Sequence, residues 1–256
     1  MIILIITFDS LLNNCETWID INEETVNKLE DLQFTMYRTL LSTPKSTPPP
    51  ALCWDFGSLS MKFRIIKKKL LFIHHVINMD ETALAKQIQN VQQKYFLPGL
   101  TKECQSLIYQ LNLPNIFDDK VNLSKHKWKI LVKKKIKDEN EKYLKELMND
   151  YKKLKNSKLI GEKFETKDYI KDLTVEEARA VFKHRTSMTR YTKFNYKNDP
   201  LYSRQLWKCE SCDNISTESH ILWCSGFKHL REGLDLKSDK DLAKYLLDVV
   251  NIRSKN

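Results

Sequence analysis

Four soft metal-binding side chains lie close together near the C-terminal end, at Cys209, Cys212, His220 and Cys224, in the pattern C-x2-C-x7-H-x3-C. A C-x2-C pair lets two thiolates approach one ion from a tight turn. His220 and Cys224 have helical i,i+4 spacing and are expected to share one face of a helix. Two ligands from a turn and two from a helix form a closed tetrahedral set. The spacing therefore predicts one structural Zn²⁺ ion and not a catalytic one.

The alternative is that these residues are ordinary buried cysteines or a disulfide. Four ligands at zinc-site spacing favour the metal. The other cysteines, Cys15, Cys53 and Cys104, are far apart and suggest no disulfide framework, so we expect a reducing compartment, nuclear or cytoplasmic. Structural zinc in small modules contributes about 10–16 kcal/mol of binding free energy, which is largely folding free energy. Removal of the ion is therefore expected to unfold this end of the chain.

The elements that position these ligands are expected to be helices. Hydrophobic residues make up 41% of the 256 residues, enough for a packed core, and only 5 Gly and 7 Pro interrupt long charged periodic segments. We expect a mainly α fold, a helical bundle followed by a small zinc-stabilised knuckle module. The chain carries 43 Lys and Arg against 33 Asp and Glu, a net charge of +10. This balance favours a polyanionic partner, although many basic proteins are merely well solvated.

The order of segments predicts five parts. They are a strand (1–8) and a helix in residues 1–42, a Pro-rich connector at 43–58, a helical domain at 59–155, a polar linker at 156–172, and a basic helix with the zinc knuckle and a C-terminal helix at 173–256. Residues 43–50 are expected to be an extended spacer and not a helix, with a ligand for a proline-reading module as the less common meaning. The apolar start is too short to span a bilayer and lacks a basic flank, so we expect neither a membrane helix nor a signal peptide.

Helix boundaries follow from capping residues. Asn22 is expected to cap the first helix, Asp80 a helix from Glu81 to about Tyr95, and Ser124 the longest helix, to about Lys155. The apolar stripe of that longest helix comprises Trp128, Leu131, Val132, Ile136, Tyr143, Leu147, Tyr151 and Leu154. On the opposite side run lysines that include Lys133, Lys134 and Lys135. Such a run is either a solvated face or a track for phosphates.

A second basic segment precedes the zinc set. Thr174 and Glu177 form a capping box that opens a helix. Val175, Ala178 and Phe182 are expected to bury one side of this helix, and Arg179 and Lys183 to share another. Arg185 falls in the apolar sector, where it either snorkels or points at a phosphate.

The residues after this helix alternate basic and aromatic types. They are Arg190, Tyr191, Lys193, Phe194 and Tyr196. This mixture stacks bases and neutralises phosphates in proteins that bind single strands. The same aromatics could instead pack on the zinc module. With Arg179, Lys183, Arg185 and the three lysines of the longest helix, they are the candidate nucleic-acid contacts.

Catalytic constellations are weak. The Phe117, Asp118, Asp119 sequence lacks the register and the flanking strands of a polymerase metal site, and an acidic loop is the better interpretation. Asp235 and Lys237 match only half of a nuclease metal site. His74 and His75 are adjacent and point about 100° apart on a helix, so they cannot form a shared ligand pair. We expect no catalytic residue and no small-molecule substrate.

Several stretches, taken in this order, resemble the C-terminal region of the reverse-transcriptase polyproteins of non-LTR (LINE-type) retrotransposons. The residues that carry the resemblance are Asn14 to Trp18, Arg38 to Pro48, Leu70 to His75, Ala83 to Lys86, Ala178 and Arg179 with Phe182 to Arg185, and the zinc set ending in His220 to Cys224. In that family a polymerase core with catalytic aspartates is followed by a thumb, a helical linker and a Cys-Cys-His-Cys knuckle.

The resemblance implies that residues 1–100 correspond to the thumb end and the linker, so the bundle would be thumb-like. It implies that Cys209, Cys212, His220 and Cys224 are the knuckle ligands, and that RNA template or target DNA is the partner. The polymerase core has no counterpart in these residues, so a core acting in trans or a truncated element copy is implied. The competing hypotheses are a zinc-stapled protein-interaction scaffold and an inert relic of an element.

Overall fold

The computed structural model describes residues 10–118, 120–151, 154, 162–186, 209, 212, 214 and 218–255. These residues are mainly helical, as predicted, and the described ranges contain no β-strand, only an isolated bridge between Phe56 and Thr166. The chain divides into two compact units. The first comprises residues 1–35 and 58–146, and the second comprises residues 36–57 and 147–256. The expected N-terminal strand at 1–8 lies outside the described residues.

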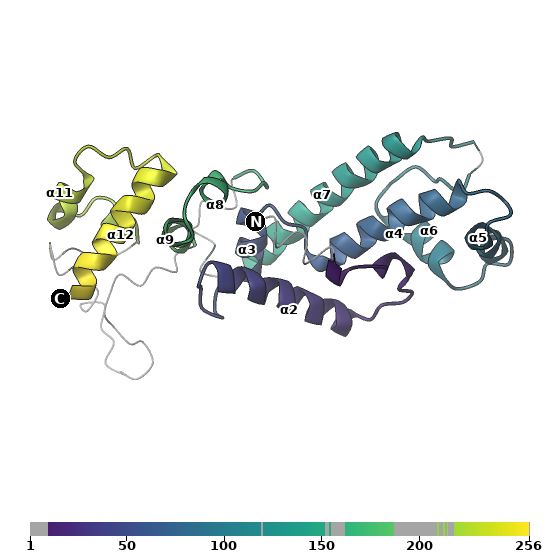
Figure 1. Cartoon of the computed structure of the whole chain (residues 1–256), viewed down its shortest axis with the longest axis horizontal. Helices are drawn as coiled ribbons and strands as arrows, with labels where there is room; N and C mark the ends of the chain where they lie inside the picture. Colours follow the sequence, from purple (N-terminus) through teal and green to yellow (C-terminus); the bar gives the residue numbers. More distant parts are fainter. Residues whose placement is uncertain are drawn as a thin grey trace. The chain divides into compact units, whose positions relative to one another are not determined.

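The first unit is a helical bundle (Figure 1). Its helices are α4 (Met61–Ile77), α5 (Leu84–Lys94), α6 (Leu100–Gln110) and most of α7 (Lys125–Asp150), with the short η1 (Cys15–Thr17) and the start of α2 (Glu23–Leu40). Leu70, Ile73 and Trp128 lie in its core, and the Trp128 indole Nε1 donates to the Leu70 carbonyl at 2.8 Å. The ring of His74 stacks on Trp128 and its Nε2 lies 2.9 Å from the Leu123 carbonyl oxygen, so His74 is a core histidine.

The second unit carries the predicted zinc ligands. Its helices are the last turn of α2, α3 (Pro49–Asp55), α8 (Asp168–Asp172), α9 (Val175–Arg185), α10 (Glu218–Ile221), η4 (Ser225–Phe227), α11 (Lys228–Arg231) and α12 (Asp239–Lys255). Within this unit α12 lies between α9 and α11 (Figure 1). Tyr245, Leu246 and Val249 of α12 pack with two of the cysteines in one apolar cluster. The C-terminal helix expected within residues 173–256 is therefore present, and it packs against the candidate metal ligands.

Several helix ends are where the capping residues place them. The Asn22 side chain accepts a hydrogen bond from the Thr25 amide at 2.8 Å and caps α2. Thr174 and Glu177 form both hydrogen bonds of the capping box at the start of α9. No helix among the described ranges combines the length and the apolar character that a bilayer crossing requires.

The Pro-rich stretch differs from the prediction, because α3 begins at Pro49 inside it. Proline is tolerated at the first helical positions, where the backbone amide has no partner within the helix, and its fixed φ suits the helix. Ala51, Leu52 and Trp54 are fully buried, so this segment contributes to the core of the second unit. The expectation of an extended spacer over residues 43–50 is wrong for Pro49 and Pro50.

Three other expectations are corrected. Asp80 accepts a hydrogen bond from the Thr82 amide at 2.8 Å in a turn, and α5 begins only at Leu84. On the faces of helices, Leu131 and Val175 were expected to be buried, but they are 36% and 57% exposed. In the expected polar linker, residues 162–172 include the short helix α8, and Tyr169 is 1% exposed. Aromatic burial makes this stretch part of the second unit and not a spacer.

Candidate metal centre and its surroundings

Four predicted ligands converge in the second unit. One ligand atom each from Cys209, Cys212, His220 and Cys224 lies within 4.8 Å of the others. The Cys224 Sγ atom lies 3.5 Å from the Sγ atoms of both Cys209 and Cys212, and the Cys212 Sγ lies 3.2 Å from the His220 Nε2. Tetrahedral ligands with Zn–S bonds of about 2.3 Å place the sulfurs about 3.7 Å apart. The cluster therefore has the size that a Zn²⁺ ion requires.

The first two ligands come from a tight turn, as the C-x2-C spacing predicts. The Cys212 amide donates to the Cys209 carbonyl at 3.3 Å, and the Cys209 amide donates to the Asn214 carbonyl at 2.6 Å. The Asn214 Nδ2 lies 3.6 Å from the Cys212 Sγ. A hydrogen bond from the Asn214 backbone amide lowers the pKa of the Cys212 thiol, which favours the thiolate form that binds metal.

The other two ligands do not share one helix, contrary to the prediction. His220 lies in α10, which ends at Ile221, and Cys224 itself has the non-helical backbone angles φ −57° and ψ 127°. The Trp223 amide closes this turn on the His220 carbonyl at 2.9 Å. The turn, and not a continued helix, brings the Cys224 sulfur to the site. The ligand identities stand, and only the expected backbone between them changes.

A buried apolar cluster supports the site from beneath. Ile221 and Phe227 pack against Tyr245 of α12, whose hydroxyl donates to the Ile221 carbonyl. The Arg231 Nη1 donates to the Cys224 carbonyl at 2.8 Å. Burial raises the pKa of Cys224 to about 11, so coordination would replace the thiol proton with the charge of the ion. The residues fit a closed structural site with no free ligand position.

Two predicted nucleic-acid contacts lie one helical turn apart on α9, whose Ala180 packs against the same apolar cluster. Arg179 and Lys183 are half-buried, and within the described residues neither has a carboxylate at ion-pair distance. The Arg179 Nε is buried without a hydrogen-bond partner there. Burial, and then the charge of Arg179, lower the pKa of Lys183. The pair is therefore a local excess of positive charge.

Arg185 is held by carboxylates of its own unit. Its Nε and Nη2 lie 3.1 and 3.2 Å from the two oxygens of Asp55, and its Nη1 and Nη2 lie 3.1 and 2.6 Å from those of Glu162. The Tyr169 hydroxyl also donates to Asp55, at 2.6 Å. Both predicted alternatives for Arg185, snorkelling and a phosphate contact, give way to this buried ion cluster. We name it the Arg185 clamp.

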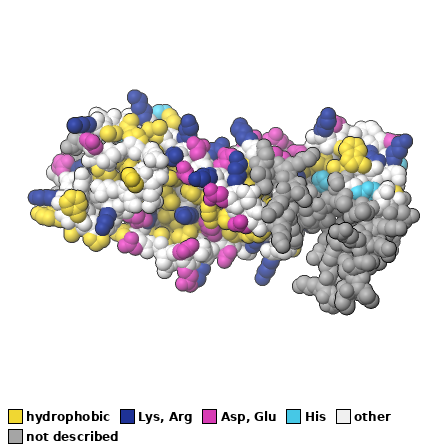
Figure 2. All heavy atoms as spheres, turned by 180° about the vertical axis from the view of Figure 1, so that it is seen from behind, with side chains coloured by type: hydrophobic (Ala, Val, Ile, Leu, Met, Phe, Trp, Pro, Cys, Tyr) yellow, Lys and Arg dark blue, Asp and Glu magenta, His cyan; other side chains and the backbone are white. Residues whose placement is uncertain are grey.

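The remaining candidates divide into two groups. Lys133 and Lys134 are exposed on α7, and Lys135 forms an i,i+4 ion pair with Glu139 at 3.2 Å. Arg190, Tyr191, Lys193, Phe194 and Tyr196 lie outside the described residues. On the coloured part of the face in Figure 2, Lys and Arg side chains are interspersed with Asp and Glu. Any nucleic-acid contact on that face would therefore depend on small groups of Lys or Arg side chains and not on one broad basic patch.

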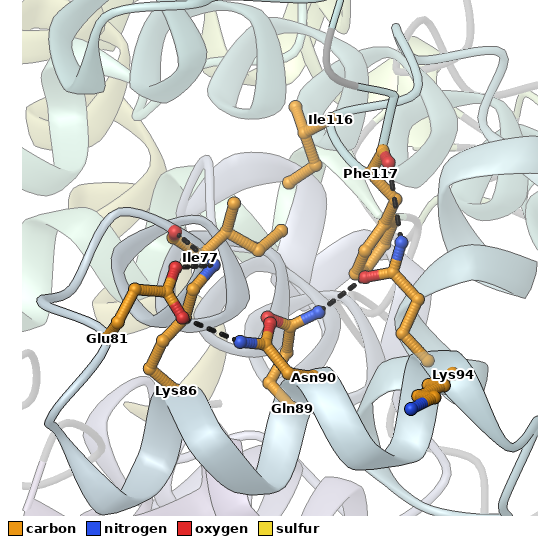
Figure 3. Close-up of a pocket in the computed structure, with 9 residues that line it drawn as sticks. Ile77, Glu81, Lys86, Gln89, Asn90, Lys94, Ile116 and Phe117 are labelled. Atoms are coloured by element: carbon orange, nitrogen blue, oxygen red, sulfur yellow. Dashed lines mark hydrogen bonds and ion pairs between the residues drawn. The ribbon is translucent and has the colours of Figure 1, made fainter.

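No catalytic set is assembled among the residues that the structure describes. Asp118 and Asp235 each accept a hydrogen bond from an amide two positions later, at 3.0 and 3.1 Å, and act as turn residues. A cavity of about 450 Å³ in the first unit, beside α5, is lined mainly by amide and charged side chains (Figure 3). These groups bond to one another, as in the pair of Glu81 and Asn90 at 2.8 Å. The lining residues of the cavity include no serine, threonine or cysteine and no pair of carboxylates, and the amine of Lys86 is bonded to the Ile77 carbonyl at 2.8 Å.

Two features escaped the sequence reasoning. Asp55 and Glu162, the partners of Arg185, are far from it in the chain, and no local pattern links them. Trp223, between two of the zinc ligands, is 78% exposed. Its position directly before Cys224 was visible in the sequence, but its exposure was not.

The comparisons with known proteins found no relative. No protein-family model, no curated protein and no solved structure matches this chain. The function must therefore be argued from the site itself.

Proposed function

We propose that this chain is a non-catalytic module that binds single-stranded nucleic acid through its second unit, stabilised by one structural Zn²⁺ ion. The observation that carries the proposal is the convergence of the four ligands on a cluster that also contacts α9. That helix carries Arg179 and Lys183 without neutralising carboxylates among the described residues. A metal-ordered support beside an unneutralised cationic pair is suited to holding a phosphate backbone.

The energetics of the pair favour an anionic ligand. Like charges one turn apart on a helix repel each other, and partial burial adds a desolvation cost for both. A phosphate oxygen between them would relieve the repulsion and accept charge-assisted hydrogen bonds. It would also give the buried Arg179 Nε a partner, which it lacks in the described part of the chain.

The biological setting that we propose is the C-terminal region of a non-LTR retrotransposon reverse transcriptase. Support comes from the zinc set with His220 to Cys224 and from the Ala178 to Arg185 stretch, which resemble that family. RNA template or target DNA would be the ligand, in the nucleus or cytoplasm. RNA-directed DNA synthesis would require a polymerase core in addition to these residues, since the catalytic aspartates have no counterpart among them.

Titration of fluorescent single-stranded RNA with the full chain, at two salt concentrations and with or without a zinc chelator, tests the proposal. We expect salt-sensitive binding that the chelator abolishes, because phosphate binding releases counterions and the support requires the ion. The double charge reversal Arg179→Glu with Lys183→Glu is expected to weaken binding. It should also reduce the salt slope by about one for each phosphate that the variant no longer neutralises.

The matched control reverses Lys240 and Lys244, which are exposed on α12 with the same i,i+4 spacing and the same change in charge. Only the α9 variant should weaken binding strongly. Equal losses in both variants would show that net charge alone matters, and no binding by the folded, zinc-loaded chain would reject the proposed function.

A second candidate, a zinc-stapled protein-interaction scaffold, is favoured by one observation. A stripe on α5 consists of Leu84, Ile88 and Val91, which are 70%, 49% and 47% exposed, and Tyr95, directly after the helix, is 60% exposed. Exposed apolar stripes of this kind mark protein contact surfaces. Binding of a protein through this stripe would be insensitive to salt, which separates it from the nucleic-acid proposal.

A further inference from the structure

An exposed indole lies between two of the candidate metal ligands. Trp223 is 78% exposed, whereas its neighbours Ile221 and Cys224 are fully buried. Indole has a large apolar surface, and in small modules it is usually at least partly buried. An exposed tryptophan beside a metal site therefore suggests a contact with a ligand.

The backbone of Trp223 is held on both sides. Its amide donates to the carbonyl of His220 at 2.9 Å, and Arg231 binds the carbonyl of the next residue, Cys224, at 2.8 Å. His220 and Cys224 are both predicted zinc ligands, so a bound ion would fix the turn further. Ile221 and Phe227, close to it along the chain, are 0% and 3% exposed and belong to the apolar cluster. The exposed indole is therefore presented on a turn that is anchored to this cluster, and such preorganisation lowers the entropy cost of binding.

We infer that Trp223 is a stacking platform for one base of a single-stranded nucleic acid. This inference rests on the proposed function and names the residue that contacts a base. Unpaired bases expose both faces of the ring, and stacking on an aromatic side chain tolerates any sequence. Bases within a duplex are already stacked, so the platform selects single strands.

Cationic side chains close by in the sequence can hold the adjoining phosphates. Lys228 and His229 are exposed on α11, which follows directly after η4 and the Cys224 turn. Arg231 is excluded from this role because it binds the Cys224 carbonyl. The expected ligand is therefore a base stacked on Trp223 with its backbone phosphate near α11, and a double strand is expected to bind more weakly.

The test uses the full zinc-loaded chain with Trp223→Ala and Trp223→Phe. Loss of one stacked base costs about 1–3 kcal/mol, so the alanine variant should bind single-stranded RNA about 5- to 150-fold more weakly. The phenylalanine variant should retain most of the affinity because it keeps an aromatic face. The control is Phe96→Ala, since Phe96 is 86% exposed in the first unit and should contribute nothing. Zinc content and circular dichroism establish that each variant is folded.

An abasic strand of the same length supplies the second measurement. It keeps the phosphates and removes the bases, so wild type and Trp223→Ala should bind it equally. Wild-type affinity of the alanine variant for normal RNA would overturn the inference and leave the proposed function standing. An equal loss on the abasic strand would also overturn it, because the effect would not be stacking. Absence of binding by the wild-type chain would overturn the proposed function and the inference together.

Discussion

The Arg185 clamp predicts a large effect from a very small substitution. Asp55 is fully buried and accepts hydrogen bonds from Arg185 and from the Tyr169 hydroxyl. Asp55→Asn keeps the shape of the side chain and removes its charge. The guanidinium then keeps only Glu162 as a counterion. The new amide nitrogen is itself a donor, and it faces a donor where the carboxylate oxygen accepted a hydrogen bond.

The expected magnitude follows from what each partner retains. Removing one member of a buried ion pair costs about 3–5 kcal/mol when the other is left uncompensated. After Asp55→Asn, Arg185 is still paired with Glu162, and its side chain is 19% exposed, so we expect a loss of about 2–3 kcal/mol. Arg185→Gln leaves the fully buried Asp55 without a cation. Its loss of stability should therefore be larger, at the upper end of about 3–5 kcal/mol.

Urea unfolding followed by circular dichroism measures both variants. With a slope of about 2 kcal/mol per molar urea, the midpoint should fall by about 1 M for Asp55→Asn and by more for Arg185→Gln. The control is Asp168→Asn, whose exposed pair with Lys171 should leave the midpoint unchanged. An Asp55→Asn midpoint equal to that of the control, or an Arg185→Gln variant that is less affected than Asp55→Asn, would refute the reasoning.

Two further predictions concern the metal and pH. Cys212→Ser removes one ligand from the turn, so the zinc content measured by atomic absorption should fall from about one ion per chain towards none. The apolar cluster beside the site should then become exposed and bind a hydrophobic dye. A fully metallated variant would contradict the ligand assignment. Burial would raise the pKa of Glu162, but hydrogen bonds and charge from Arg185 and Lys167 outweigh it and hold the pKa below its ordinary value of 4.5. Glu162 therefore stabilises the fold above pH 4.5, and this contribution is lost as pH falls through the lowered pKa. The free energies of unfolding of wild type and Glu162→Gln should therefore converge in acid. A constant difference between them at all pH values would contradict this.

Short-range features were predictable from the sequence. The cap at Asn22 and the capping box at Thr174 depend on residues within a few positions of one another, and the four candidate metal ligands lie in one short segment. The i,i+4 pair of Glu141 and Lys145 is also present, at 2.8 Å. In each case the spacing along the chain identifies the residues that interact, although the backbone between His220 and Cys224 differs from the expected helix.

Long-range features were not predictable. Arg185 in an apolar sector suggested a snorkelling side chain or a phosphate contact, because its carboxylate partners lie in segments with no periodic relation to α9. The helix at Pro49 was missed because proline argues against a helix interior, whereas here it occupies the first turn. Burial of Trp54 and Tyr169 depends on packing between distant segments, which a single sequence does not reveal.

The Arg185 clamp also determines which pieces of the chain can exist alone. The second unit draws residues 36–57 from between the two segments of the first unit and residues 147–256 from after them. A proteolytic fragment or shortened gene copy that starts beyond residue 57 would retain Arg185 and Tyr169 but lose Asp55, leaving a phenol without its acceptor and a guanidinium with half of its counterions. Such a fragment should remain sensitive to proteases upstream of the zinc module even when the metal is bound. Adding back a peptide that contains α3 should restore its resistance.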